Sequence, residues 1–70
     1  MYFRRIKDLR EDDDIGQKEI AAFLKIPRST YAGYENGHRR IPAEILIKLA
    51  EFHNVSIDYL LGVSDNPERR

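Results

Sequence analysis

Prolines and glycines occur singly in this chain, and their positions limit the regular elements to short helices. Pro27 and Pro42 suit the start of a helix, where the amide hydrogen that proline lacks has no helical partner. Gly37 and Gly62 suit the residue just after a helix, which commonly adopts a left-handed conformation. Between these points apolar residues recur three and four positions apart, and no segment shows the alternation of a half-buried strand. The pattern therefore predicts an all-α fold.

The apolar spacing places five helices, each with one buried face. We expect them at residues 3–11, 17–24, 28–36, 42–54 and 57–61. Ser56 can cap the last helix, because its hydroxyl accepts a hydrogen bond from a free amide of the first turn. Seventy residues form at most one domain. We predict that this domain covers residues 1–62 and that a frayed C-terminal tail covers residues 63–70.

The composition argues against a metal protein and an enzyme. There is no cysteine, so disulfides and thiolate metal ligands are excluded. His53 falls on the apolar face of its helix, where we expect a packed core imidazole and not a ligand. The chain contains no glycine-rich phosphate loop and no nucleophile with a plausible base. We therefore predict no metal, no cofactor and no enzymatic activity.

The N-terminal residues also bear on location. Charged residues follow the first three positions, where a signal peptide or a membrane span would be apolar. A chain without cysteine suits a reducing compartment. We expect a cytoplasmic protein that has no membrane partner.

Charge is neutral in total but uneven along the chain. The twelve basic and twelve acidic residues cancel, which by itself argues weakly against a nucleic-acid binder. Residues 15–40, however, hold five basic residues and two acidic ones, and an acidic cluster at residues 11–14 directly precedes them. One basic face is therefore compatible with the neutral total, although charge alone favours ordinary solvated side chains about equally.

The segment from Gln17 to Pro42 is the most informative part of the chain. Two short predicted helices meet there across a tight Lys25-Ile26 connection, as in a helix-turn-helix. Ala21 falls at the crossing, where a small side chain lets the two backbones approach. Tyr31 and Tyr34 face the core from the second of these helices. Its outer face is free to read bases and carries Arg28, Ser29, Ala32 and Gly33.

Several residues in this chain share the spacing of one known family. They are Gln17, Ala21, Ile26, the Glu35-Asn36-Gly37 run, Pro42 and the Leu60-Leu61-Gly62 ending. In this combination the chain resembles the lambda repressor/Cro-like (XRE-type) helix-turn-helix regulators from Ile6 to Gly62. The resemblance implies a compact five-helix, lambda-repressor-like domain. It also implies a bacterial or phage transcriptional regulator, in the first instance a repressor, that binds double-stranded DNA with residues 28–36 in the major groove.

The resemblance implies roles for individual residues. Base edges are expected to meet Arg28, Ser29, Thr30, Ala32 and Gly33, with Arg28 reading guanine through two hydrogen bonds. The DNA phosphates are expected to meet Gln17, Lys18, Asn36, His38, Arg39 and Arg40. Arg10 and Glu35 resemble a family ion pair that ties the first helix to the third.

Four residues depart from the family pattern. Pro27 replaces the usual Ser or Thr at the start of the third helix. Gly16 replaces the usual Ser or Thr cap before the second helix. Lys25 stands where Gly or Asn is commoner, so backbone strain is expected if the turn keeps a left-handed residue. Gly33 stands where other members often place a base-reading side chain. Direct readout is therefore expected to be sparse, and the cost of a mid-helix glycine needs a compensation such as close approach to DNA.

Apolar residues at the C-terminal end suggest a partner surface. Tyr59, Leu61 and Val63 are the predicted dimer contact, although simple closure of the core explains them about equally well. A homodimer would bind a near-palindromic operator with half-sites about 10 bp apart. The alternative is a protein-interaction module, such as an antitoxin or an adaptor, in which a protein partner comes first and DNA binding is secondary.

Overall fold

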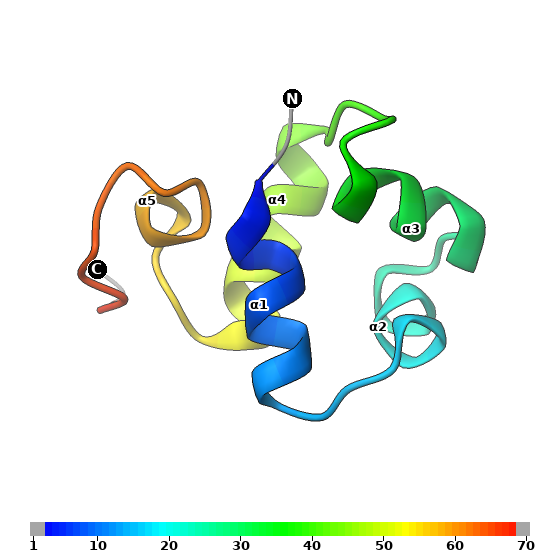
Figure 1. The fold of residues 1–70 in the computed structure, drawn as a ribbon, viewed down its shortest axis with the longest axis horizontal. Helices are drawn as coiled ribbons and strands as arrows, with labels where there is room; N and C mark the ends of the chain where they lie inside the picture. Colours follow the sequence, from blue (N-terminus) through cyan, green and yellow to red (C-terminus); the bar gives the residue numbers. More distant parts are fainter. Residues whose placement is uncertain (1–2, 69–70) are drawn as a thin grey trace.

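The computed structural model describes residues 3–68, which form five α-helices and no β-strand within that range (Figure 1). The helices are α1 (Arg4–Asp12), α2 (Gln17–Leu24), α3 (Arg28–Asn36), α4 (Ala43–His53) and α5 (Ile57–Leu60). The prediction of an all-α, five-helix fold is confirmed. Residues 1–2 and 69–70, at the ends of the predicted domain and tail, lie outside the described residues. No described helix is both long and apolar enough to cross a membrane.

Several predicted helix boundaries are wrong by one residue, for local backbone reasons. Phe3 and Pro42 are extended and serve as N-caps, so α1 and α4 each begin one residue later than expected. α4 also ends before Asn54, which is left-handed, and α5 ends before Leu61. α1 runs one residue further than predicted, to Asp12. A proline at the N-cap loses no hydrogen bond, because the missing amide hydrogen would have no helical partner.

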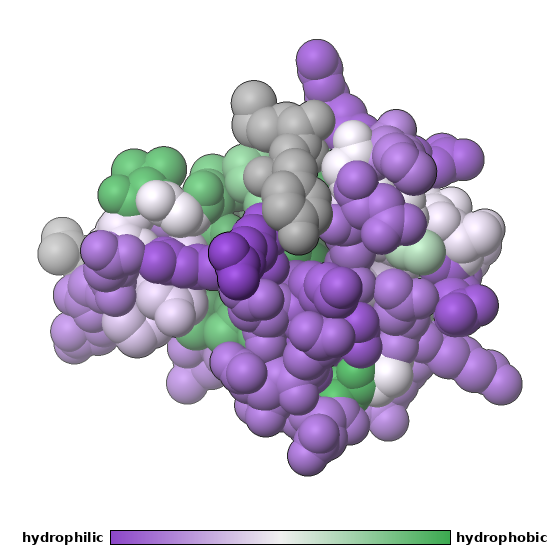
Figure 2. Space-filling view, viewed as in Figure 1, coloured by the Kyte–Doolittle hydropathy of each residue, from purple (hydrophilic) through white to green (hydrophobic). Residues whose placement is uncertain are grey.

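Every helix contributes one large, completely buried side chain to a single core. These residues are Ile6, Ile20, Tyr31, Leu49 and Leu60. α1 packs against α3 and α4, α2 packs against the same two helices, and α5 packs on α4. Full burial of one such aliphatic or aromatic side chain stabilises a fold by roughly 1.5–3 kcal/mol. The face in Figure 2 is mostly hydrophilic, and its hydrophobic side chains gather toward the α5 side.

The segment after α5 folds back onto the domain, so the expected frayed tail is wrong for residues 63–68. The backbone amide of Ser56 donates to the carbonyl of Pro67 at 3.0 Å. Arg5 of α1 donates to the carbonyl of Ser64 at 2.6 Å and to Oδ1 of Asp65 at 2.6 Å. The partners in these hydrogen bonds lie far apart in the sequence, and no local sequence pattern predicts that they meet. The predicted domain boundary at residue 62 stays a prediction.

The N-terminus of α5 is capped as expected. The backbone amide of Tyr59 donates to Oγ of Ser56 at 3.0 Å. Arg5 reaches this helix as well, since its Nη1 donates to the carbonyl of Tyr59 at 2.9 Å and its guanidinium lies 4.1 Å above the centre of the Tyr59 ring. Arg5 therefore ties α1 to both α5 and the segment that follows it.

His53 is a packed residue, as the apolar face of its helix predicted. Its side chain is completely buried, and the ring of Phe52 meets it edge-on with 5.1 Å between the centroids. Burial lowers the pKa of His53 below its ordinary value of 6.5, although Asp13, whose Oδ2 lies 3.8 Å from Nδ1, acts in the opposite direction. The imidazole is therefore held in its neutral form at physiological pH.

Candidate nucleic-acid interface

Backbone hydrogen bonds fix the turn between α2 and α3. Lys25 is left-handed, with φ 59° and ψ 43°. The amides of Lys25 and Ile26 donate to the carbonyls of Ala22 and Ala21 at 3.2 and 3.1 Å. Left-handed backbone costs a residue other than glycine about 1–2 kcal/mol, so Lys25 carries the expected strain. Ala21 of α2 is buried, and α2 packs against α3.

α3 buries one side and exposes the other. Tyr31, Tyr34 and Glu35 are buried against the rest of the domain. Arg28 and Ser29, in the first turn, are exposed, whereas Thr30, Ala32 and Gly33 are half-buried. Figure 1 shows α3 at the edge of the molecule, with α2 below it. The beginning of α3 is therefore accessible to a large ligand.

The first turn of α3 also presents free backbone amides. Pro27 is the N-cap, and its carbonyl accepts from the amides of Thr30 and Tyr31 at 3.1 and 3.2 Å. The amides of Arg28 and Ser29 precede these bonds, so they have no acceptor within the helix. Because the helix dipole adds positive charge at this end, the first turn attracts anions and hydrogen-bond acceptors.

A polar network holds α3 in place from behind. Nε and Nη2 of Arg10 donate to the two carboxylate oxygens of Glu35 at 2.6 and 3.1 Å. The pair is almost fully enclosed, with side-chain exposures of 12% for Arg10 and 1% for Glu35. Nη1 of Arg10 donates to the carbonyl of Ile15 at 2.8 Å. The expected ion pair between the first and third helices is thus present, and it also anchors the loop before α2.

Gln17 joins the same network. Its Nε2 donates to Oε1 of Glu35 at 3.1 Å, so the first residue of α2 is bonded to the end of α3. Burial raises the pKa of Glu35, but contacts with Arg10, Tyr31 and Gln17 outweigh it and hold that pKa below 4.5. Burial also raises the pKa of Tyr31. The carboxylate of Glu35 therefore stays ionised and holds α2 in a fixed position relative to α3.

A compact loop with cationic side chains follows α3. Gly37 is left-handed, with φ 78°, and the amides of His38 and Arg39 both donate to the carbonyl of Gly33, at 2.9 and 3.1 Å. Asn36, His38, Arg39 and Arg40 are all exposed. The loop thus presents its cations at the C-terminal end of α3.

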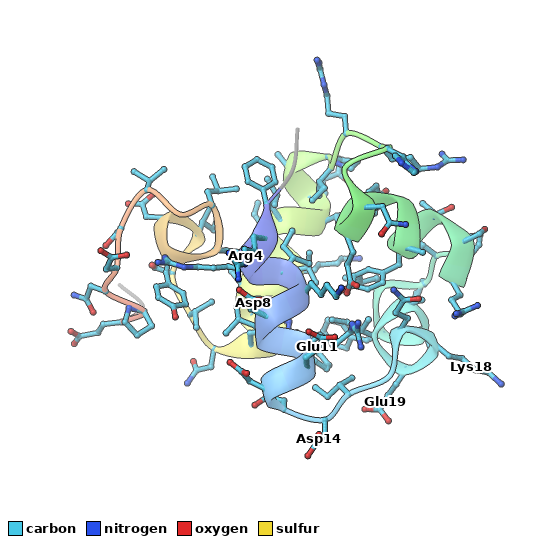
Figure 3. All side chains as sticks on the ribbon, viewed as in Figure 1. Arg4, Asp8, Glu11, Asp14, Lys18 and Glu19 are labelled. Atoms are coloured by element: carbon cyan, nitrogen blue, oxygen red, sulfur yellow. The ribbon has the colours of Figure 1, made fainter. Side chains whose placement is uncertain are left out.

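The acidic cluster lies at a different end of the molecule. Figure 3 shows Asp14 and Glu19 pointing away from the loop after α3, whereas Lys18 points outward from α2. Glu11 and Asp14 are exposed. The neutral total charge is therefore distributed so that the acidic cluster does not cover the exposed start of α3.

The comparison with known families agrees with this geometry. The helix-turn-helix family model matches residues 6–60, which is most of the chain. The chain belongs to the helix-turn-helix family. This match confirms the predicted XRE-type family and the lambda-repressor-like fold. In this helix-turn-helix domain, α2 and α3 are the two helices of the motif.

Curated relatives are similar over nearly the whole chain. An uncharacterized HTH-type transcriptional regulator, YobD of Bacillus subtilis (strain 168), is 35% identical over 97% of this chain and 61% of its own length. The cryptic phage CTXphi transcriptional repressor RstR of Vibrio cholerae is 35% identical over 93% of this chain and 59% of its own. The HTH-type transcriptional regulator AnsR of Bacillus subtilis (strain 168) is 40% identical over 89% and 53%. The chain thus spans little more than half the length of these relatives.

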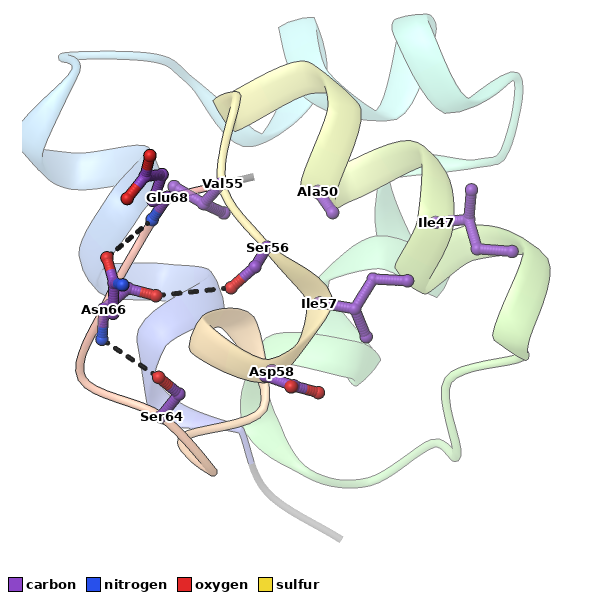
Figure 4. A pocket seen from close by; sticks show the side chains of 9 residues that line it. All are labelled: Ile47, Ala50, Val55, Ser56, Ile57, Asp58, Ser64, Asn66 and Glu68. Atoms are coloured by element: carbon purple, nitrogen blue, oxygen red, sulfur yellow. Dashed lines mark hydrogen bonds between the residues drawn. The ribbon is translucent and has the colours of Figure 1, made fainter. Parts of the chain in front are cut away.

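Only part of the predicted dimer contact of this helix-turn-helix domain is exposed. Val63 is 76% exposed, but Leu61 and Tyr59 are half-buried, and Arg5 lies over the Tyr59 ring. Sequence reasoning missed Ile47 of α4 and Ile57 of α5, which are 47% and 38% exposed. Figure 4 shows both lining a cavity of about 350 Å³ between α4, α5 and the C-terminal segment. Helical spacing cannot reveal such a surface, because it depends on which apolar residues the other helices leave uncovered.

Two further contacts of the helix-turn-helix motif were not foreseen. The bond from Gln17 to Glu35 makes Gln17 part of the link between α2 and α3, in addition to its predicted place at the DNA backbone. The stem of Arg39 lies over Gly33, so a side chain of the domain itself fills the space where DNA was expected to approach. Gly33 was the sequence signal for this contact, because a glycine destabilises a helix and its presence there calls for a structural explanation.

Proposed function

We propose that this protein is a transcriptional regulator, in the first instance a repressor, that binds double-stranded DNA with α3 in the major groove. The observation that carries this proposal is the exposed first turn of α3, held from behind by the network of Arg10, Glu35 and Gln17. A recognition helix must be rigid as well as exposed, since a misplaced side chain loses its hydrogen bonds to a base. The DNA-binding role agrees with the helix-turn-helix family.

Base recognition falls to the outer side of α3. The proposed base-contacting residues are Arg28, Ser29, Thr30 and Ala32. Gly33, which was expected to join them, is covered by the stem of Arg39. Arg28 is the main reader, because it is exposed in the first turn and its guanidinium can donate two hydrogen bonds to guanine. Ser29 is equally exposed but shorter, and Ala32 can pack against a thymine methyl group.

Phosphate contacts flank α3 on both sides. The proposed set is Gln17, Lys18, Asn36, His38, Arg39 and Arg40. Lys18 lies at the start of α2, and Arg40 lies in the loop after α3, so the two cations bracket the recognition helix. Such contacts set the affinity and the salt dependence of binding, and they carry no sequence preference of their own.

We further propose that the regulator acts as a homodimer in the cytoplasm, by binding and not by catalysis. Val63 remains the best candidate of the predicted dimer contact, and the exposed Ile57 and Ile47 join it in place of the half-buried Tyr59 and Leu61. Dimers of this kind match two-fold symmetric operators with half-sites about one helical turn apart. Analytical ultracentrifugation of Ile57→Lys and Val63→Lys is expected to show a monomer where the unaltered chain shows a dimer.

Selection from a random pool of double-stranded DNA tests the proposal directly. The unaltered chain is expected to enrich one half-site motif and to bind it more weakly as salt rises. Arg28→Ala is expected to lose about 1–3 kcal/mol at one base position, whereas Lys18→Ala weakens binding to all sequences alike. A pure adaptor would enrich no motif and show no salt dependence, and that result would overturn the proposal.

A further inference from the structure

Gly33 is an unusual residue for the middle of a recognition helix. A glycine inside a helix destabilises it relative to alanine, and α3 is only nine residues long. The backbone of Gly33 is helical, so no left-handed turn explains the glycine. The reason must lie in what the missing Cβ leaves room for.

The stem of Arg39 occupies that room. A Cβ added at Gly33 would lie 2.9 Å from Cδ of Arg39, 3.0 Å from Cγ and 3.5 Å from Cβ. Two of these distances are shorter than ordinary van der Waals contact between carbon atoms. The methylene groups of Arg39 therefore lie along the backbone of α3, in a seat that a Cβ at position 33 would partly fill.

The backbone of Arg39 is fixed to the same residue. Its amide donates to the carbonyl of Gly33 at 3.1 Å, alongside the amide of His38 at 2.9 Å, and the left-handed Gly37 makes this return possible. Arg39 is thus held to α3 by its main chain and by its stem. A side chain restricted in this way loses less conformational entropy on binding than a free surface arginine does.

The guanidinium of Arg39 is available to a ligand. Arg39 is exposed, and among residues 3–68 no carboxylate forms an ion pair with it. Its stem crosses α3 at Gly33, one helical turn after Ser29 and one turn before Asn36. Arg39 belongs to the loop after α3, but its stem lies against the helix that carries the proposed base readers.

We propose that Arg39 is a specificity-determining residue, which Gly33 positions so that its guanidinium reads a base in place of a side chain at position 33. This inference rests on the proposed function. The chemical target is the O6 and N7 acceptor pair of guanine, which a planar guanidinium meets with two parallel hydrogen bonds. It extends the phosphate contact that the sequence implied for Arg39, because a phosphate contact alone requires no fixed stem.

The test compares base preferences of variants in the DNA pool selection. Arg39→Ala is expected to lose preference at one base pair of the half-site by roughly 5- to 150-fold. Arg39→Lys keeps the stem and the charge but not the two parallel donors, so it is expected to lose the same preference and keep the salt dependence. Arg40→Ala is the matched control and is expected to weaken all sequences alike.

Gly33→Ala tests the seat itself. The added methyl group is expected to displace the Arg39 stem, to weaken preference at the same base pair, and to leave the urea midpoint of unfolding no lower, since alanine favours helix. In an Arg39→Ala background the same change is expected to have no further effect on that base pair. Gly16→Ala is the control, because a Cβ there meets nothing within 4 Å.

The outcomes separate the two proposals. If the unaltered chain enriches no motif, the proposed function fails. If it enriches a motif and both Arg39→Ala and Arg39→Lys keep its full base preference, Arg39 contacts phosphate only and the inference is overturned. Equal effects of Gly33→Ala with and without Arg39 would also overturn it, because the glycine would then act independently of that side chain.

Discussion

Two arginines of α1 tie this helix to distant parts of the chain, and they do so in different surroundings. Arg10 meets Glu35 of α3 inside the domain, with side-chain exposures of 12% and 1%. Arg5 meets Asp65 of the C-terminal segment at the surface, with exposures of 27% and 98%. The shortest distance between nitrogen and oxygen is 2.6 Å in both pairs. We therefore expect burial, and not the distance between nitrogen and oxygen, to decide how much each ion pair contributes to the free energy of unfolding.

The largest expected effect comes from breaking the buried pair. Glu35→Leu leaves the Arg10 guanidinium enclosed without its partner, so the free energy of unfolding is expected to fall by about 3–5 kcal/mol. A small domain has roughly 5–15 kcal/mol in total, so this variant is close to unfolding. Urea denaturation followed by circular dichroism measures the loss.

The matched control for this prediction is the double variant Arg10→Met and Glu35→Leu, which removes both charges. It is expected to recover most of the stability, because apolar side chains of similar volume fill the site. If Glu35→Leu alone costs less than about 1 kcal/mol, the buried link behaves like a surface pair, and the contrast between the two arginines is broken.

The next effect is a loss of stability in acid. Because the pKa of Glu35 is lower in the folded state than its ordinary 4.5, its contribution is complete above that value and is lost as pH falls below it. The lowered pKa of His53 adds an earlier loss, which begins as pH falls through 6.5. Urea midpoints measured between pH 7.5 and 3 are expected to fall in both ranges.

The double variant Arg10→Met and Glu35→Leu separates the two contributions to the acid profile. This variant keeps His53 and lacks the carboxylate of Glu35. Its urea midpoint is therefore expected to fall as pH drops below 6.5, but without the additional fall below pH 4.5. An unchanged decline below pH 4.5 would show that Glu35 is not its source.

A smaller effect is expected at the exposed link. Arg5→Ala removes one surface ion pair and the contact with the Tyr59 ring, so the expected cost is about 1 kcal/mol. Residues 63–68 should also become more accessible to protease, because Arg5 holds the carbonyl of Ser64. Arg4→Ala is the control on the same helix, since within residues 3–68 Arg4 pairs only with Asp8, at 3.5 Å in an exposed position. Equal digestion rates in the two variants would contradict the role of Arg5.

The smallest expected effect is that of salt. Raising sodium chloride to about 1 M shortens the Debye length to about 3 Å, which screens the exposed pair and spares the enclosed one. The cost of Arg5→Ala is therefore expected to shrink by a few tenths of a kcal/mol, whereas the cost of Glu35→Leu stays the same. Urea titrations of both variants at low and high salt make the comparison. A parallel decrease in the two costs would mean that both pairs are equally hydrated.

The two links also differ in how far the sequence predicts them. The buried pair was expected, because Arg10 and Glu35 occupy positions that resemble a family ion pair. The exposed link was not, because Arg5 reaches backbone carbonyls of Tyr59 and Ser64. Every residue offers a carbonyl, so no residue type marks such a partner. The frayed tail was a wrong prediction for the same reason.

The sequence by itself determined the five short helices and the helix-turn-helix. These features depend on local rules, since apolar spacing marks a buried helical face and proline or glycine marks a helix end. The left-handed backbone of Lys25 was expected from the resemblance instead, because Gly or Asn is commoner at this place in the family.

Only the tertiary structure decided which surface stays free and what lies over each residue. The seat of Arg39 on Gly33, the fold-back of residues 63–68 and the exposure of Ile47 and Ile57 all depend on packing between separate segments. Helical periodicity shows that a residue lies on one side of its own helix. Whether that side is covered depends on where the other segments lie, and a local pattern carries no information about that.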